Sequence, residues 1–61
     1  MEKQLQRDVV RDIIRRHRQG LSLSEYDVRH GVAADPRLYR LALRAFGNWL
    51  GALKAAGIRE P

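Results

Sequence analysis

The 61-residue sequence contains no cysteine, so neither a disulfide framework nor a thiolate zinc site can contribute to its stability. It also lacks any run near the roughly 18 consecutive apolar residues that a membrane-spanning helix needs. No apolar signal segment follows the first four residues, Met-Glu-Lys-Gln, and the default compartment is therefore the cytosol. We expect a cytoplasmic protein that does not enter a membrane.

The sequence also lacks the marks of an enzyme. Gly47 and Gly51 are not followed by the Lys-Ser/Thr of a phosphate-binding loop, and Ser22 and Ser24 have no base and orienting acid close in sequence. A chain this short buries only about 60% of the surface of its unfolded form, which leaves little room for a sheltered pocket. We expect no catalytic residue, no cofactor and no small-molecule substrate.

Metal ligands are scarce as well. The only two histidines are His17 and His30, and neither has another histidine three or four residues away, the spacing of a helical metal pair. We interpret His17 as a partly buried residue on an apolar helix face, and His30 as a turn or capping residue. The sequence therefore predicts no metal site.

Acidic residues are few beside the basic ones. Seven Asp and Glu stand against 12 Lys and Arg, which gives a formal charge of +5 and a pI near 10.8. Ten of the basic residues are arginine, whose planar guanidinium suits bidentate contacts with phosphate. A high-GC genome or a thermophilic lineage would enrich arginine without any ligand. Composition alone therefore does not decide between a phosphate-containing ligand and such a bias.

Hydrophobic residues make up 44% of the chain, too many for a disordered basic tail. Residues 2–19 predict a first helix that ends at Gly20. Its apolar face has positions three and four residues apart: Leu5, Val9, Val10, Ile13, Ile14 and His17. The opposite side has a stripe of Arg7, Arg11, Arg15 and Arg18, which Asp8 and Asp12 partly neutralise through pairs with Arg11, Arg15 and Arg16.

The segment 21–31 predicts a short helix that Ser22 or Ser24 would cap and Gly31 would end. Its inner face would be formed by Leu23, Tyr26 and His30. The alternation of Leu21 and Leu23 also permits an extended entry to this segment, and that alternative stays open.

Asp35 and Pro36 mark a further helix start, as N-cap and first helical residue. The helix runs to Phe46, with an apolar face of Leu38, Leu41, Ala42 and Ala45, flanked by Tyr39, Leu43 and Phe46. On the other side Arg37, Arg40 and Arg44 fall within about 60° of one another, with no acidic residue between them.

Gly47 and Asn48 predict a tight break and a new N-cap, followed by a last helix over 49–56 that Gly57 ends. Its buried face would consist of Trp49, Leu50, Leu53 and Ala56, with Ile58 folding back against it. Residues 1–61 thus predict a single small all-α domain, a compact bundle of three to four helices around Trp49.

The C-terminal pair of helices, joined by a short turn, resembles the helix-turn-helix unit of DNA-binding proteins. Its second helix would present a surface of Asn48, Gly51, Ala52, Lys54 and Ala55. We predict a double-stranded DNA ligand, with Arg37, Arg40 and Arg44 as the main phosphate contacts and Asn48 as a candidate base contact. Secondary contacts would come from Arg29, Lys54, Arg7, Arg11, Arg15 and Arg18. RNA is disfavoured because all four aromatic residues fall on apolar faces rather than on a stacking surface.

The residues Leu38-Tyr39, Ala42, Phe46-Gly47-Asn48-Trp49, Ala52-Leu53 and Ala55-Ala56-Gly57-Ile58 resemble the homing-endonuclease-associated repeat. This is a small helical module found beside HNH nuclease domains and in other prokaryotic and phage proteins. The resemblance implies a DNA-binding module in which Trp49, Phe46, Leu53 and Gly57 are scaffold residues. Asn48 stands where the repeat usually has Ser, and both are good N-caps.

The chain has one copy of this pattern and no nuclease, which removes cleavage activity and the avidity of linked copies. We therefore expect the module to form a homodimer, to bind weakly, or to act with a protein partner. The alternative function is an accessory module whose arginines bind an acidic protein partner.

Overall fold

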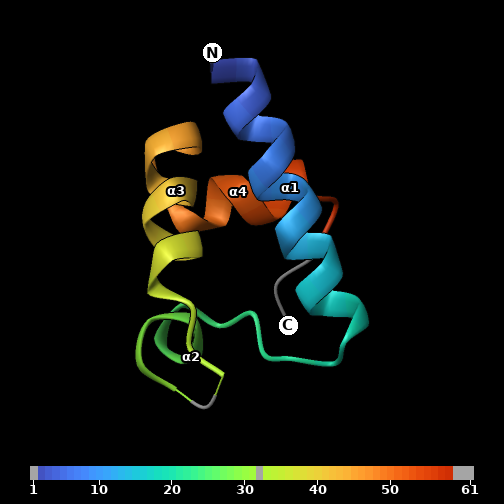
Figure 1. Ribbon diagram of the computed structural model, residues 1–61, viewed down its shortest axis with the longest axis vertical. Helices are drawn as coiled ribbons and strands as arrows, with labels where there is room; N and C mark the ends of the chain where they lie inside the picture. The colour runs from blue at the N-terminus through green and yellow to red at the C-terminus, as the bar shows by residue number, and fades with distance from the viewer. Residues whose placement is uncertain (1, 32, 59–61) are drawn as a thin grey trace.

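The computed structural model describes residues 2–31 and 33–58, which form four α-helices and, within those ranges, no strand. The helices are α1 (Glu2–Arg18), α2 (Glu25–His30), α3 (Pro36–Phe46) and α4 (Trp49–Ala55). In Figure 1, α1 and α3 stand upright beside each other, α4 lies across them, and α2 closes the lower end. The protein is therefore a small all-α bundle, as the sequence predicts.

Local signals start and end these helices. The side chains of Ser24, Asp35 and Asn48 accept hydrogen bonds from the first turns of α2, α3 and α4. Gly47 ends α3 with a φ of +87°, in the left-handed region that costs glycine little. Because this turn is so short, α4 begins at once after α3 and folds back over the core.

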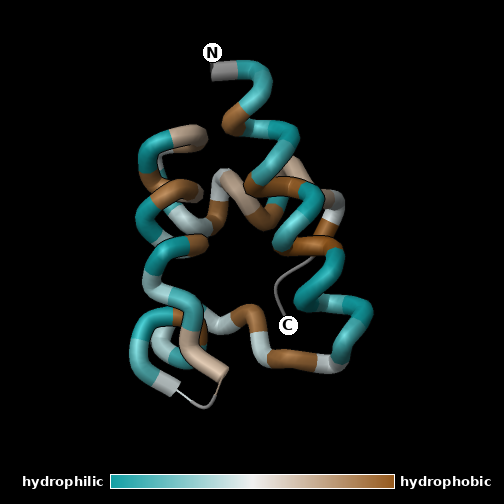
Figure 2. Tube along the Cα trace, viewed as in Figure 1, coloured by the Kyte–Doolittle hydropathy of each residue, from teal (hydrophilic) through white to brown (hydrophobic). Residues whose placement is uncertain are grey.

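Trp49 joins the helices at the centre. Its side chain is 4% exposed, its Nε1 donates to the Leu23 carbonyl at 2.8 Å, and its ring lies 5.9 Å from that of Tyr39. Figure 2 shows hydrophobic segments of α1, α3 and α4 where these helices meet. The fully buried residues around Trp49 come from all four helices: Val9, Ile13, Val28, Leu38, Ala42, Ala52 and Leu53.

The buried side of α1 is rotated from the predicted one. His17 is exposed, whereas its neighbour Arg16 is 6% exposed. Arg16 continues the line of Val9 and Ile13 toward the loops, where two backbone carbonyls accept hydrogen bonds from its Nε and Nη1 while its buried Nη2 has no partner. The prediction of a partly buried His17 is therefore wrong, and the apolar face of α1 is wider than the strip that the core covers.

Two short helices also bury other residues than predicted. In α2, Val28 is the buried residue, while Tyr26 is 70% exposed and His30 is exposed as well. In α4, Leu50 is 52% exposed and Ala52 is fully buried, the reverse of the prediction. A helix of two turns or fewer has no periodicity long enough to define which side meets its neighbours.

Candidate nucleic-acid interface

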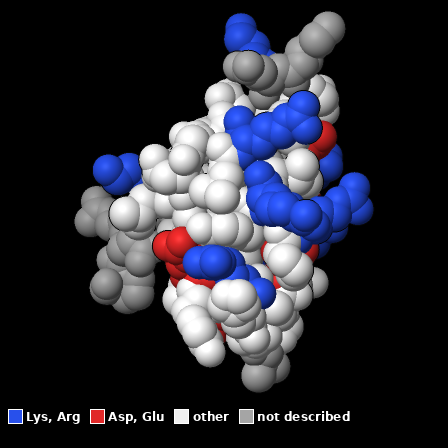
Figure 3. All heavy atoms as spheres, turned by 90° about the vertical axis from the view of Figure 1, so that its left-hand side faces the viewer, with Lys and Arg blue, Asp and Glu red and all other residues white. Residues whose placement is uncertain are grey.

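Three arginines share one outer face of α3. Arg37, Arg40 and Arg44, called here the α3 arginine face, are all exposed, because Leu38 and Ala42 on the other side of the helix are buried. Within the described residues none of the three forms an ion pair. Figure 3 shows Lys and Arg side chains gathered on the side of the molecule that lies to the left in Figure 1, where α3 lies. This face is free to meet an anionic ligand.

Arg29 lies beside this face but is already engaged. Its guanidinium carbon stands 5.2 Å from the centre of the Tyr39 ring, and its Nη1 lies 3.9 Å from Glu25 Oε2. The Tyr39 hydroxyl donates to the same Glu25 oxygen at 2.6 Å, and this hydrogen bond raises the pKa of Tyr39. Arg29 thus has less free charge to offer a ligand than the arginines of α3.

The α1 basic stripe, defined as Arg7, Arg11, Arg15 and Arg18, is a second and separate cationic surface. All four side chains are exposed. Arg11 pairs with Asp8 at 3.2 Å, as predicted, and this pair is solvent-exposed and therefore weak. The predicted pairs of Asp12 with Arg15 and Arg16 are both wrong: no ion pair of Asp12 forms within the described residues, and Arg16 turns inward and bonds to backbone carbonyls.

The exposed side of α4 offers little to read a base. The Asn48 Oδ1 accepts from the Gly51 amide at 2.6 Å, so a base contact through this oxygen would compete with the helix cap. Ala52 is in the core rather than on the predicted surface. Lys54 remains as the exposed cation of α4. The α4 surface is therefore a poor match for a recognition helix.

Sequence reasoning missed two features. The Arg16 guanidinium donates from Nε to the Ser22 carbonyl and from Nη1 to the Ala33 carbonyl, both at 2.7 Å. Tyr26 is an exposed aromatic whose ring centre lies 5.6 Å from that of His30, so the premise that every aromatic faces the core is wrong for Tyr26. Arg16 lies seven positions after Val9 and three after Ile13, on the same side of a helix. This spacing was the signal in the sequence that Arg16 faces the core.

In residues 2–31 and 33–58, no three His, Asp or Glu side chains come together in a way that could hold a metal ion. None of the described helices has both the length and the apolar character needed to span a bilayer.

Comparisons of the chain with protein-family models, with curated proteins and with solved structures found no match. The resemblance to the homing-endonuclease-associated repeat therefore stays a prediction. What the site can do follows from its own geometry and charge.

Proposed function

We propose that this protein binds double-stranded DNA through the α3 arginine face. The observation that carries the proposal is that Arg37, Arg40 and Arg44 are exposed on one side of a single helix, without an ion-pair partner in the described part of the chain. Guanidinium groups that are not neutralised within the protein can release counterions from phosphates, which is the main source of non-specific DNA affinity.

The spacing of these arginines fits a phosphate backbone. Arg44 lies seven positions after Arg37, which at the helical rise corresponds to about 10 Å along α3. With α3 laid along the DNA axis, where the phosphates of one strand rise about 3.4 Å each, the three side chains extend over about three phosphate steps. The backbone of α3 is already ordered by packing of Leu38 and Ala42 in the core, so binding orders only the arginine side chains.

Other cations would add to this contact without defining it. We propose Lys54, Arg29 and the α1 basic stripe as secondary contacts and Asn48 as a minor one, because its oxygen already caps α4. The protein would have no catalytic activity and would act as a binding module of the kind that the homing-endonuclease-associated repeat resemblance implies. In a prokaryotic cell or a phage-infected one, DNA binding agrees with a cytoplasmic location.

The test compares two variants that lose the same charge. The first replaces Arg37, Arg40 and Arg44 by Ala, and the control replaces Arg7, Arg11 and Arg15 by Ala. Fluorescence anisotropy with a labelled duplex at low salt should show at least about a tenfold greater loss of affinity for the first variant. Circular dichroism should show both variants folded, since all six side chains are exposed. Equal losses would mean that only net charge matters, and the assignment to α3 would be wrong.

A further inference from the structure

A groove runs along the side of α1 that the core leaves uncovered. It has a volume of about 910 Å³, and its apolar floor consists of Val10, Ile14, Phe46 and Ala55. Val10 and Ile14 are one helical turn apart and half-buried, Phe46 is the last residue of α3, and Ala55 is the last of α4. This floor is the part of the wide apolar face of α1 that no other described helix covers.

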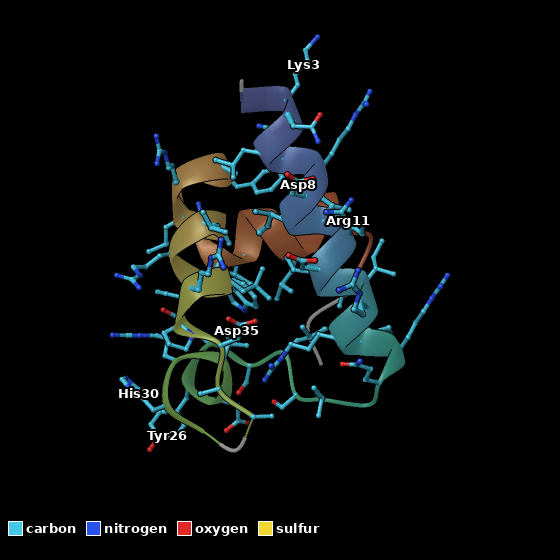
Figure 4. The ribbon with its side chains drawn as sticks, viewed as in Figure 1. Lys3, Asp8, Arg11, Tyr26, His30 and Asp35 are labelled. Atoms are coloured by element: carbon cyan, nitrogen blue, oxygen red, sulfur yellow. The ribbon has the colours of Figure 1, made fainter. Side chains whose placement is uncertain are left out.

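The rim of this α1 groove is cationic. Five of the lining side chains from α1 are cationic, and none of the described lining residues is acidic: the cations are Lys3, Arg7, Arg11, Arg15 and Arg18. Only Arg11 has an ion-pair partner among the described residues, Asp8. In Figure 4, Lys3 projects from the start of α1, and Arg11 lies further along the same helix. Apolar floor and positive rim thus occur in one continuous surface.

We propose that the α1 groove docks an acidic amphipathic helix of a protein partner. A helix laid in a groove presents an apolar ridge to the floor, and carboxylates on the side of that ridge that faces α1 would meet the arginines. Complementary charge of this kind increases the specificity and the association rate of binding. The floor explains why the ligand is a protein, because Val10, Ile14 and Phe46 can offer nothing to a phosphate backbone.

Two other occupants are a second copy of this chain and a lipid surface. A second copy of this chain would bring like charges together, since the rim holds five cations and the chain has a net charge of +5. The groove is open on its outer side, so vesicle binding in the experiment below distinguishes a lipid surface from a protein helix. The α1 groove shares no residue with Arg37, Arg40 and Arg44, so the inference does not rest on DNA binding by α3.

The experiment uses a synthetic peptide as the probe. The peptide is a helix of about 16 residues, the length of α1 that lines the groove, with leucines along one face and glutamates flanking them. A scrambled peptide of the same composition, with the leucines spread around the helix, is the matched probe control. Fluorescence anisotropy should give at least about tenfold tighter binding for the patterned peptide. Amide shifts in NMR spectra of the unaltered protein should concentrate at Val10, Ile14 and Phe46.

Three variants distinguish what the apolar floor, the cationic rim and the net charge each contribute to peptide binding. Ala55→Gln fills the floor with an exposed polar side chain and should weaken peptide binding about tenfold. Arg15→Glu should weaken it to a similar extent, whereas Arg40→Glu, with the same change of charge outside the groove, should leave it within about threefold. Trp49 fluorescence reports that each variant is folded, because Trp49 is buried in the core.

Several outcomes would overturn the proposal. Equal binding of the patterned and scrambled peptides would mean that net charge alone attracts them, and full binding by Ala55→Gln would mean that the floor is not used. Binding to phosphatidylserine vesicles that Ala55→Gln abolishes, while the patterned peptide does not bind, would assign the groove to lipid. A concentration-dependent dimer that Ala55→Gln disrupts would assign the groove to a second copy.

Discussion

At the scale of single residues, Arg16 is a charged side chain that serves the core. It is 6% exposed, and its guanidinium joins the end of α1 to the carbonyls of Ser22 and Ala33. Ala33 has a φ of +61°, a left-handed backbone that is costly for a residue with a Cβ. The bond from Arg16 helps to hold this conformation, and thereby the loop that leads into α3.

We expect Arg16→Ala to lower the free energy of unfolding by about 2–3 kcal/mol, because two charged hydrogen bonds to part-buried carbonyls are lost. Arg15→Ala is the matched control and should change it by less than about 0.5 kcal/mol, since Arg15 is exposed. Urea denaturation followed by circular dichroism measures both. Equal effects of the two substitutions would show that the contacts of Arg16 add nothing to stability.

Asp27 gives a prediction about pH. The Ser22 and Ser24 hydroxyls and the charge of Arg16 lower the pKa of Asp27 below its usual 3.8. A lowered native pKa means that the ionised carboxylate stabilises the fold above the unfolded pKa, and that this contribution is lost as the pH falls through the native pKa. Asp27→Asn should therefore lose less stability than the unaltered protein as the pH falls below about 4 and through the native pKa of Asp27.

Urea midpoints across this range measure the difference, and Ser22→Ala provides a second variant, because it removes the largest cause of the lowered pKa. It should also flatten the acid dependence. If Asp27→Asn follows the same acid profile as the unaltered protein, then Asp27 is not among the carboxylates responsible for it.

At the scale of the helix, the boundaries were predictable and several buried faces were not. Asp35, Gly47 and Asn48 act through contacts within a few residues of themselves, so the sequence alone indicates them. The exposed side of α3 was predictable for a related reason, since a helix of three turns repeats its pattern often enough. Which side of α1 or α4 is covered depends on how helices cross, which is a long-range property. Hence His17 and Leu50 were misplaced.

The N-cap of α4 is a contact between residues close in sequence, Asn48 and Gly51, and its contribution to stability can be measured. Asn48→Ala should cost about 1 kcal/mol, because the Gly51 amide loses its acceptor, whereas Asn48→Ser should cost only a few tenths. Thermal denaturation by circular dichroism distinguishes the two. Identical midpoints for both variants would show that the cap makes no net contribution to stability.

At the scale of the whole molecule, one core holds four short helices, and Trp49 is its largest member. The radius of gyration is 10.3 Å, and residues from each helix meet around the indole. The same arrangement points the α3 arginine face and the α1 groove outward on separate helices. The cations could be assigned to helices from the sequence, but the groove could not, because it requires Phe46 and Ala55 to come beside α1.

Trp49→Ala should remove about 3–5 kcal/mol, which is most of the stability of so small a domain. We expect its helical circular dichroism to collapse at room temperature. Trp49→Phe retains an aromatic ring but loses the hydrogen bond to Leu23, and should stay folded with a lower urea midpoint. A fully helical and cooperatively unfolding Trp49→Ala variant would mean that the indole is not central to the core.

The salt dependence of duplex binding tests most directly whether the α3 arginine face binds DNA phosphates. For about four to six contacts, log K should fall with log salt at a slope near −4 to −5, at about −0.9 per phosphate. Replacing Arg37, Arg40 and Arg44 by Ala should make that slope shallower by roughly 2.7, the share of three contacts. An unchanged slope in this triple variant, with its affinity intact, would contradict the account.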